Sequence, residues 1–211
     1  MKNLFKKLSL VAVALFTLTS CIKEDDYAIP TVIELLLNET FESTTTGSGA
    51  NEVPISLEGW GNYSVVGSRK WHSRIFSNNK YAEFSSFFSV AATDPNDEIW
   101  LITPAVDLTN SVNEVLSFDT KIRFWQGQCL TVYVSENYDG TQAGISTATW
   151  TQLNPILPTS SQADIFVNSG NIDLSMYNSS NVRVAFKYVG SKQNNVTTTY
   201  QLDNIKIFEN L

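Results

Sequence analysis

The stretch VLSFDTKIRFW, residues Val115–Trp125, alternates apolar and polar side chains with the period of two that a half-buried β-strand requires. One face of such a strand packs against a core, and the other carries polar and charged groups. The expected core face holds Leu116, Phe118, Ile122 and Phe124, and the expected polar face holds Asp119, Lys121, Arg123 and Trp125. The stretch therefore predicts a sheet with one buried face and one polar face.

The same pattern continues on both sides of this strand. Gln126-Gly127 and Asp139-Gly140 supply turn residues, while Leu130–Ser135 and Val182–Tyr188 alternate as Val115–Trp125 does. No convincing amphipathic helix interrupts the pattern. Further strands are expected at Thr31–Phe41, Trp60–Val66, Lys70–Phe76, Lys80–Phe88, Glu98–Thr103 and Tyr200–Phe208. Many short strands predict a single all-β domain over residues 31–211, an antiparallel two-sheet β-sandwich of the jelly-roll type.

The first twenty residues have the pattern of a targeting segment rather than of a folded domain. Three lysines precede the apolar run Leu8–Leu18, which is too short to span a bilayer as a stable helix. Leu18-Thr19-Ser20-Cys21 resembles a bacterial lipobox, in which the cysteine is acylated and the preceding peptide is removed. We therefore predict a lipoprotein signal peptide over residues 1–20 and a lipid on Cys21. The alternative is an ordinary signal peptide with a chance cysteine.

Residues 21–30 are charged and end at Pro30, which indicates an acidic tether. Within it, Lys23-Glu24-Asp25-Asp26 resembles the surface-export signal of Bacteroidetes lipoproteins, and a solvated tether is the plainer, compatible interpretation. The resemblance implies an outer-membrane lipoprotein that faces outward and contacts the membrane through its lipid anchor. Because removal of residues 1–20 takes away three lysines and no acids, the formal net charge of −7 becomes about −10. Such a chain is expected to repel nucleic acid.

Six short motifs stand at separate places between residues 36 and 208. They are Glu39-Thr40-Phe41-Glu42, Gly59-Trp60, Trp100–Leu108 (WLITPAVDL), Leu116–Asp119 (LSFD), Val184–Tyr188 (VAFKY) and Tyr200–Ile205 (YQLDNI). In this order they resemble the choice-of-anchor J, or cleaved-adhesin-like, domain of Bacteroidetes surface proteins. The resemblance implies a jelly-roll sandwich similar in shape to MAM domains and carbohydrate-binding modules, with a non-catalytic binding or adhesion role. This chain carries the domain almost alone, unlike many relatives, which speaks against a role as the appendage of an enzyme.

The last expected strand contains a break in its alternation. Tyr200 and Leu202 have even numbers, whereas Ile205 and Ile207 have odd numbers. One face of a strand can bury all four only if the strand holds an extra residue, since neighbouring positions point to opposite faces. We therefore predict a β-bulge at Asp203-Asn204.

A bulge frees backbone carbonyls, and a calcium ion needs carboxylate and carbonyl oxygens together. Related jelly rolls bind a structural calcium ion between the first and last strands, and the resemblance assigns this role to Glu42 and Asp203. Glu39 and Asn204 are further candidate ligands. The alternative is that Asp203 only hydrogen-bonds the bulged backbone, because two acids are few for a cation that takes about six or more oxygens.

The polar face of the central strands predicts a platform for a ligand. An aromatic ring packs on the apolar C–H groups of a sugar while long charged side chains bond its hydroxyls. The candidates are Trp125, Tyr133, Arg123 and Lys121, with Arg183 and Lys187 expected on an adjacent strand. Acidic glycans suit these basic side chains. The alternative to a ligand platform is that a loop or a partner protein covers the aromatic side chains and buries them.

Residues suited to catalysis are sparse, and we assign none. His72, the only histidine, could act as a base in a polysaccharide-active enzyme, but alone on an expected strand it is more typical of a structural residue. Cys129 has no neighbouring histidine, which indicates an inert thiol. The first functional hypothesis is thus a surface module that binds carbohydrate or a cell-surface partner. A structural component that binds sibling surface proteins and a polysaccharide-active enzyme are the alternatives.

Overall fold

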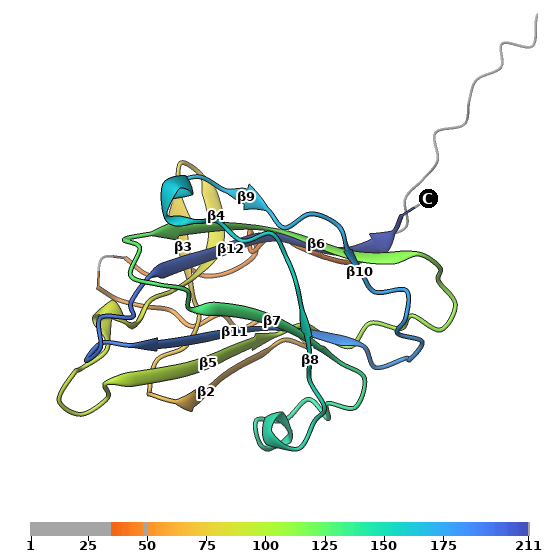
Figure 1. The fold of residues 1–211 in the computed structure, drawn as a ribbon, viewed down its shortest axis with the longest axis horizontal. Coiled ribbons are helices and arrows are strands. Elements are labelled where there is room, and N and C mark those ends of the chain that lie inside the picture. Colours follow the sequence, from red (N-terminus) through yellow and green to blue (C-terminus); the bar gives the residue numbers. More distant parts are fainter. Residues whose placement is uncertain (1–34, 49, 211) are drawn as a thin grey trace, which may run out of the picture. The chain divides into compact units, whose positions relative to one another are not determined.

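A computed structural model describes residues 35–48 and 50–210, which form two antiparallel sheets (Figure 1). The predicted all-β sandwich is confirmed. The described residues also form three short 3-10 helices, η1 (Ser86–Phe88), η2 (Ala143–Ser146) and η3 (Ser160–Gln162). None of the helices in this part of the chain is long and apolar enough to cross a membrane. The predicted signal peptide, Cys21 and the tether lie outside the described residues.

Each sheet is built around one long strand near the end of the chain. The sheet that we call the β12 sheet contains β1 (Leu35–Glu39), β3 (His72–Phe76), β4 (Asn79–Phe84), β6 (Glu114–Arg123), β9 (Val167–Asn168), β10 (Ile172–Asp173) and β12 (Thr199–Glu209). The β11 sheet contains β2 (Gly61–Val66), β5 (Asn96–Ile102), β7 (Leu130–Ser135), β8 (Thr151–Leu153) and β11 (Arg183–Ser191). Strands from distant parts of the sequence therefore lie side by side in both sheets.

The core lies between the inner faces of the two sheets. Phe118 of β6 meets Phe186 of β11 edge to face, with ring centroids 5.0 Å apart, and both rings are fully buried. Phe84 and Tyr188 make a similar contact at 4.8 Å across the same interface. Burial of each large apolar side chain stabilises the fold by about 1.5–3 kcal/mol, so this alternating inner face holds the sheets together.

The predicted bulge at Asp203-Asn204 is confirmed. The pairing of β12 with β6 shifts between Asp203 and Lys206, and Asn204 adopts a positive φ of 50°. On its other side β12 pairs with β4 before the bulge and with β1 after it. The extra residue thus sits where one partner strand ends and the next begins, and it brings both halves of β12 into phase with the core.

The prediction for the end of the central strand was wrong at two residues. Phe124, expected in the core, is 72% exposed, and Trp125, expected on the polar face, is partly buried against the core. Strand β6 ends at Arg123, and Phe124 has a φ of 51°. The left-handed backbone conformation of Phe124 interrupts the alternation of side chains between the two faces. The ring of Phe124 therefore points outward, and that of Trp125 points toward the core.

The expected strand Lys80–Phe88 was also too long at its end. Strand β4 stops at Phe84, and residues 86–88 form η1. The Ser85 side chain accepts a hydrogen bond of 3.2 Å from the backbone N–H of Phe87, which caps the short helix. Consequently Phe87 and Phe88 project from a helical turn and are 56% and 62% exposed.

A second, smaller core covers the outer face of the β11 sheet. Trp100 is only 4% exposed, and its ring lies beside Tyr133 at 5.8 Å and Trp150 at 5.1 Å between centroids. The indole N–H of Trp150 donates a 3.0 Å hydrogen bond to the carbonyl of Ile145 in η2, which ties the ring to this helix. The segment between β7 and β8 therefore closes over aromatic residues that the sequence pattern alone would leave exposed.

Candidate ligand-binding groove

Four exposed phenylalanine rings gather at the end of the sandwich where β6 ends and β12 begins. Their exposed fractions are 69% for Phe76, 56% for Phe87, 62% for Phe88 and 72% for Phe124. Phe76 ends β3, the next two lie on η1, and the last follows β6. Two adjoining hollows of about 320 and 400 Å³ share Phe88, Phe124 and Thr199 in their linings. A cluster of exposed large apolar side chains is typical of an interaction site.

The floor between these rings is polar. It consists of Arg74, Tyr81, Glu83 and Thr199, and we call it, together with the four rings, the phenylalanine groove. Tyr81 and Thr199 are buried at 6% and 7%, and the side chains of Arg74 and Glu83 are 18% and 14% exposed. The aromatic rings therefore stand out as a rim above a recessed polar floor.

Hydrogen bonds fix the turn that presents Phe124. The backbone N–H of Gln126 donates to the hydroxyl of Thr198 at 2.7 Å, and this hydroxyl donates to the carbonyl of Gly127 at 2.7 Å. Gly127 has a φ of 107°, a conformation that favours glycine. The chain therefore holds a strained, exposed aromatic residue in a fixed place, a combination that occurs at functional sites.

Glu83 joins the groove floor to a buried polar network. Its carboxylate accepts a 2.7 Å hydrogen bond from Gln201 and pairs with Arg74 at 3.4 Å. Burial works against ionisation of Glu83, but His72 and Gln201, with the charge of Arg74, outweigh it, so the pKa of Glu83 is lowered. The floor thus keeps a negative charge beside a guanidinium group.

His72 lies under the groove rather than in it. The residue is 2% exposed, and its Nε2 stands 3.7 Å from Glu52 and 3.6 Å from Glu83. A base for polysaccharide cleavage must come within hydrogen-bonding reach of the substrate. The position of His72 gives no support to the enzyme hypothesis.

The structure does not bring the six predicted ligand residues onto one face. Lys121 and Arg123 belong to β6 in the β12 sheet, whereas Tyr133, Arg183 and Lys187 belong to the β11 sheet. The sequence pattern shows which side chains share a strand face, but it does not show which strands share a sheet. Among these residues Arg123 lines the groove, and Trp125 packs on the core.

The residues on the β11 sheet have partners within the fold. Lys187 pairs with Glu98 at 3.1 Å and lies 5.1 Å from the ring centre of Trp100. Arg183 donates hydrogen bonds to Asn181 at 3.1 Å and to the carbonyl of Thr103 at 3.3 Å. These contacts engage both side chains within the fold.

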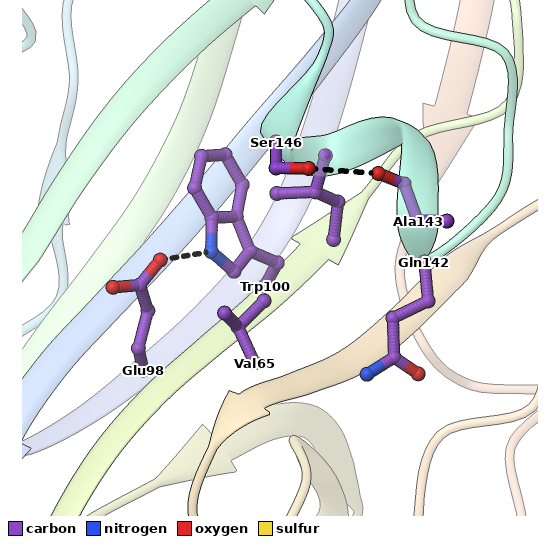
Figure 2. A pocket seen from close by; sticks show the side chains of 7 residues that line it. Val65, Glu98, Trp100, Gln142, Ala143 and Ser146 are labelled. Atoms are coloured by element: carbon purple, nitrogen blue, oxygen red, sulfur yellow. Dashed lines mark hydrogen bonds between the residues drawn. The ribbon is translucent and has the colours of Figure 1, made fainter.

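A shallow pocket of about 570 Å³ remains at the edge of the second core (Figure 2). Trp100 and Val65 line it, and the Trp100 indole N–H donates a 2.9 Å hydrogen bond to Glu98 within it. Because Trp100 is almost fully buried, it offers no open ring face on which a sugar could pack. The phenylalanine groove is therefore the better candidate for a ligand site.

Sequence reasoning missed the rim of the groove. It placed Phe124 in the core and put Phe87 and Phe88 at the end of a strand. The signal that could have found them is the run Ser85–Ser89, in which serines flank two phenylalanines, since serine favours the cap of a helical turn.

Two of the four predicted calcium ligands are brought close to each other. Asn79 donates a 2.8 Å hydrogen bond to the carboxylate of Asp203, and the neighbouring backbone N–H of Lys80 donates a 2.9 Å hydrogen bond to Glu42. Asn204 instead donates its side-chain amide to Asp119 at 2.9 Å, and the carboxylate of Glu39 accepts the backbone N–H of Phe41. The bulge therefore collects acids and amides around the junction of three strands.

Two acids, Asp119 and Glu42, lie near enough to Asp203 to affect its ionisation. Burial raises the pKa of Asp203, hydrogen bonds from Asn79 and Asn204 oppose this, and the charges of Asp119 and Glu42 add to it. No group of three or more His, Cys, Asp or Glu side chains among residues 35–48 and 50–210 could hold a metal ion. A cation here would need amide and backbone oxygens as well as the two carboxylates.

Comparison with known proteins identifies a family for this chain. The family model described as a domain of unknown function, DUF5017, matches residues 105–210, half of the sequence. The chain belongs to the DUF5017 family. The match takes in β6 to β12, and with them Phe124 and Thr199 of the groove, whereas the other three rings come from the preceding part of the chain. No curated protein sequence matches the chain.

Several solved structures are similar to this DUF5017 chain. The K1 cleaved adhesin domain of Lys-gingipain from Porphyromonas gingivalis W83 is 19% identical, with a TM-score of 0.51, over 83% of this chain and 98% of that domain. The K3 domain of the same protein is 16% identical over 82% of this chain and 99% of that domain, with a TM-score of 0.48. TmCBM27, a mannan-recognising carbohydrate-binding module, is 12% identical over 85% of this chain and 99% of that module, with a TM-score of 0.46. At these identities the K1 comparison supports the fold alone.

The charge on Glu83 makes a testable contribution to acid stability. The pKa of Glu83 in the folded protein lies below that of an ordinary glutamate. The ionised carboxylate therefore stabilises the fold at pH values above the ordinary glutamate pKa, and this stabilisation is lost as the pH falls through the folded pKa. We expect the melting temperature of Glu83→Gln to fall less between about pH 6 and about pH 3 than that of the unaltered protein. Glu58→Gln, at an exposed position, is the control. Equal slopes for Glu83→Gln and the unaltered protein would contradict this assignment.

Proposed function

We propose that this protein is a non-catalytic binding module that holds a carbohydrate in the phenylalanine groove. The observation that carries the proposal is the arrangement of four rings, each more than half exposed, around a recessed floor of polar side chains. Sugar rings present apolar C–H faces and hydroxyl edges, so they need aromatic and polar groups together. The groove offers both at once.

The placement of the polar groups favours a sugar over a protein as the ligand. Protein interfaces usually have an apolar centre and a polar rim. In the phenylalanine groove this order is reversed, because Thr199 and Glu83 lie low while Phe76 and Phe124 stand out. A narrow ligand that reaches the floor between the rings meets the hydrogen-bonding groups there.

Two resemblances support a binding role. The K1 domain that shares this fold is described as a cleaved adhesin domain. The six motifs that resemble the choice-of-anchor J domain also imply binding or adhesion, and WLITPAVDL spans the end of β5 and the segment that follows it.

A protein partner is the second candidate. Further exposed apolar side chains accompany the rings: Ile75, which lines the smaller hollow, is 49% exposed, and Val90, two residues after η1, is 57% exposed. Apolar side chains outside the rings contribute little to sugar recognition but suit a packed protein interface. Assembly with sibling surface proteins would use these side chains.

Binding to glycans distinguishes the two candidates. We expect the protein to bind at least one polysaccharide on a glycan array, and Phe124→Ala to weaken this binding about tenfold or more, because the ring loses its contact with the sugar. Ile156→Ala, which truncates an apolar residue that is 61% exposed away from the groove, serves as the matched control. Absence of binding to every glycan, or equal affinities of the two variants, would argue against the carbohydrate proposal.

We further propose that the module is an outer-membrane lipoprotein anchored through Cys21 and exposed on the cell surface. The support is the lipobox-like sequence and the acidic segment after it. Cys21→Ser is expected to move the protein from the membrane fraction to the soluble fraction, and external protease should degrade the unaltered protein on intact cells. Membrane retention of Cys21→Ser would contradict the anchor, and protection from protease would contradict surface exposure.

A structural calcium ion at the bulge of β12 is the last part of the proposal. Asp203 and Glu42 would supply carboxylate oxygens, and the cation would relieve the buried charge of Asp203. We expect a chelator to lower the melting temperature of the unaltered protein by several degrees and to leave that of Asp203→Asn unchanged. Glu58→Gln should respond to the chelator as the unaltered protein does. If the chelator has no effect on the unaltered protein, calcium has no structural role here.

A further inference from the structure

A cationic side chain lies near the face of three of the four rings of the phenylalanine groove. The Lys192 ammonium lies 3.7 Å from the ring centre of Phe87, the Arg69 guanidinium 5.7 Å from that of Phe88, and the Arg123 guanidinium 5.1 Å from that of Phe124. Cations within about 6 Å of an aromatic ring are attracted to its face. A ligand that packs against one of these rings therefore lies within reach of a positive charge.

Two further cationic side chains lie at or beside the floor, where Glu83 supplies one negative charge. Arg74 lines the groove, and Lys121 lies beside it, 5.5 Å from the ring centre of Tyr81. Burial lowers the pKa of Lys121, and the nearby charge of Arg123 lowers it further. Five cations thus gather around one groove in a chain whose formal net charge is −7. Such a local concentration attracts a ligand of opposite charge.

Acidic side chains offset these cations only in part. Arg69 pairs with Glu52, Arg74 pairs with Glu83 at 3.4 Å, and Arg123 pairs with Asp164 at 2.7 Å. The Arg123–Asp164 pair is exposed, at 44% and 65%, and such pairs contribute only about 0–1 kcal/mol. An anionic group on a ligand can therefore replace Asp164 at Arg123 at little cost, and a guanidinium binds a carboxylate or sulfate through two parallel hydrogen bonds.

We propose that the groove is specific for acidic polysaccharide, with carboxylate or sulfate groups held by Arg123 and sugar rings packed on Phe124 and Phe88. This inference rests on the proposed carbohydrate function and narrows it to one chemical class. Carboxylate and sulfate each present a pair of neighbouring oxygens that can accept two parallel hydrogen bonds from a guanidinium. Arg123 binds the anionic group of the ligand, and the aromatic rim binds its sugar rings.

The experiment compares each acidic polymer with an uncharged polymer of the same sugar backbone. Polygalacturonate is measured against its fully methyl-esterified form, and dextran sulfate against dextran, by isothermal titration with the full domain. We expect the charged member of at least one pair to bind about tenfold more tightly or better, and this preference to weaken as salt rises. The pair that shows the preference identifies carboxylate or sulfate as the recognised group.

Two variants test the role of Arg123. Arg123→Gln should reduce the preference for the charged polymer at least about fivefold, while Lys206→Gln, which removes a cation on β12 beyond the bulge, should keep it. Unchanged melting temperatures show that both variants fold. Equal loss in the two variants would overturn the role of Arg123, because it would reflect only the overall charge of the chain.

The remaining outcomes separate this inference from the proposed function. Equal binding of charged and neutral polymers would overturn the acidic specificity and leave the carbohydrate function standing. Absence of binding to all four polymers and to a glycan array would overturn both. Binding of poly-glutamate as tight as that of the acidic polymers, lost in Arg123→Gln, would replace the polysaccharide by an acidic protein segment.

Discussion

The pairing of β12 with three different strands constrains the rest of the structure. One side of β12 pairs with β6 along nearly its whole length, while the other side pairs first with β4 and then with β1. On that side, β4 and β1 come from distant parts of the sequence and follow one another along β12. The register of β12 with β4 therefore need not match its register with β1. The bulge at Asp203-Asn204 absorbs the difference and keeps the residues before and after it facing the core.

The groove follows from this arrangement. Because β12 begins at Thr199 beside the end of β6, the turn that carries Phe124 lies next to the hairpin of β3 and β4. The main core orders the strands, and the strand ends then present rings and charges at the same place. The second core of Trp100, Tyr133 and Trp150 has the opposite effect, since it closes the outer face of the β11 sheet.

The sequence was sufficient for features that depend on local periodicity. The strand Leu130–Ser135 and the bulge in β12 were predicted because alternation and its interruption are visible in the chain. Strand partners were not predictable in this way, so Tyr133 and Arg123 were placed on one face although they lie on different sheets. Phe124 and Trp125 were exchanged because a single residue with positive φ reverses a strand's faces and leaves no trace in the hydrophobic pattern.

The rim of the groove consists of residues at strand ends and on a short helical turn, not of residues within the ladders of the two sheets. Phe76, Phe87, Phe88 and Phe124 each come from a position where the main chain has already left, or is about to leave, regular pairing. All four rings are more than half exposed, and none of them belongs to the buried core. Under the proposed function, changes at these four positions would alter which ligand binds without disturbing the paired strands of the sandwich, so new affinities could be selected in libraries restricted to those positions.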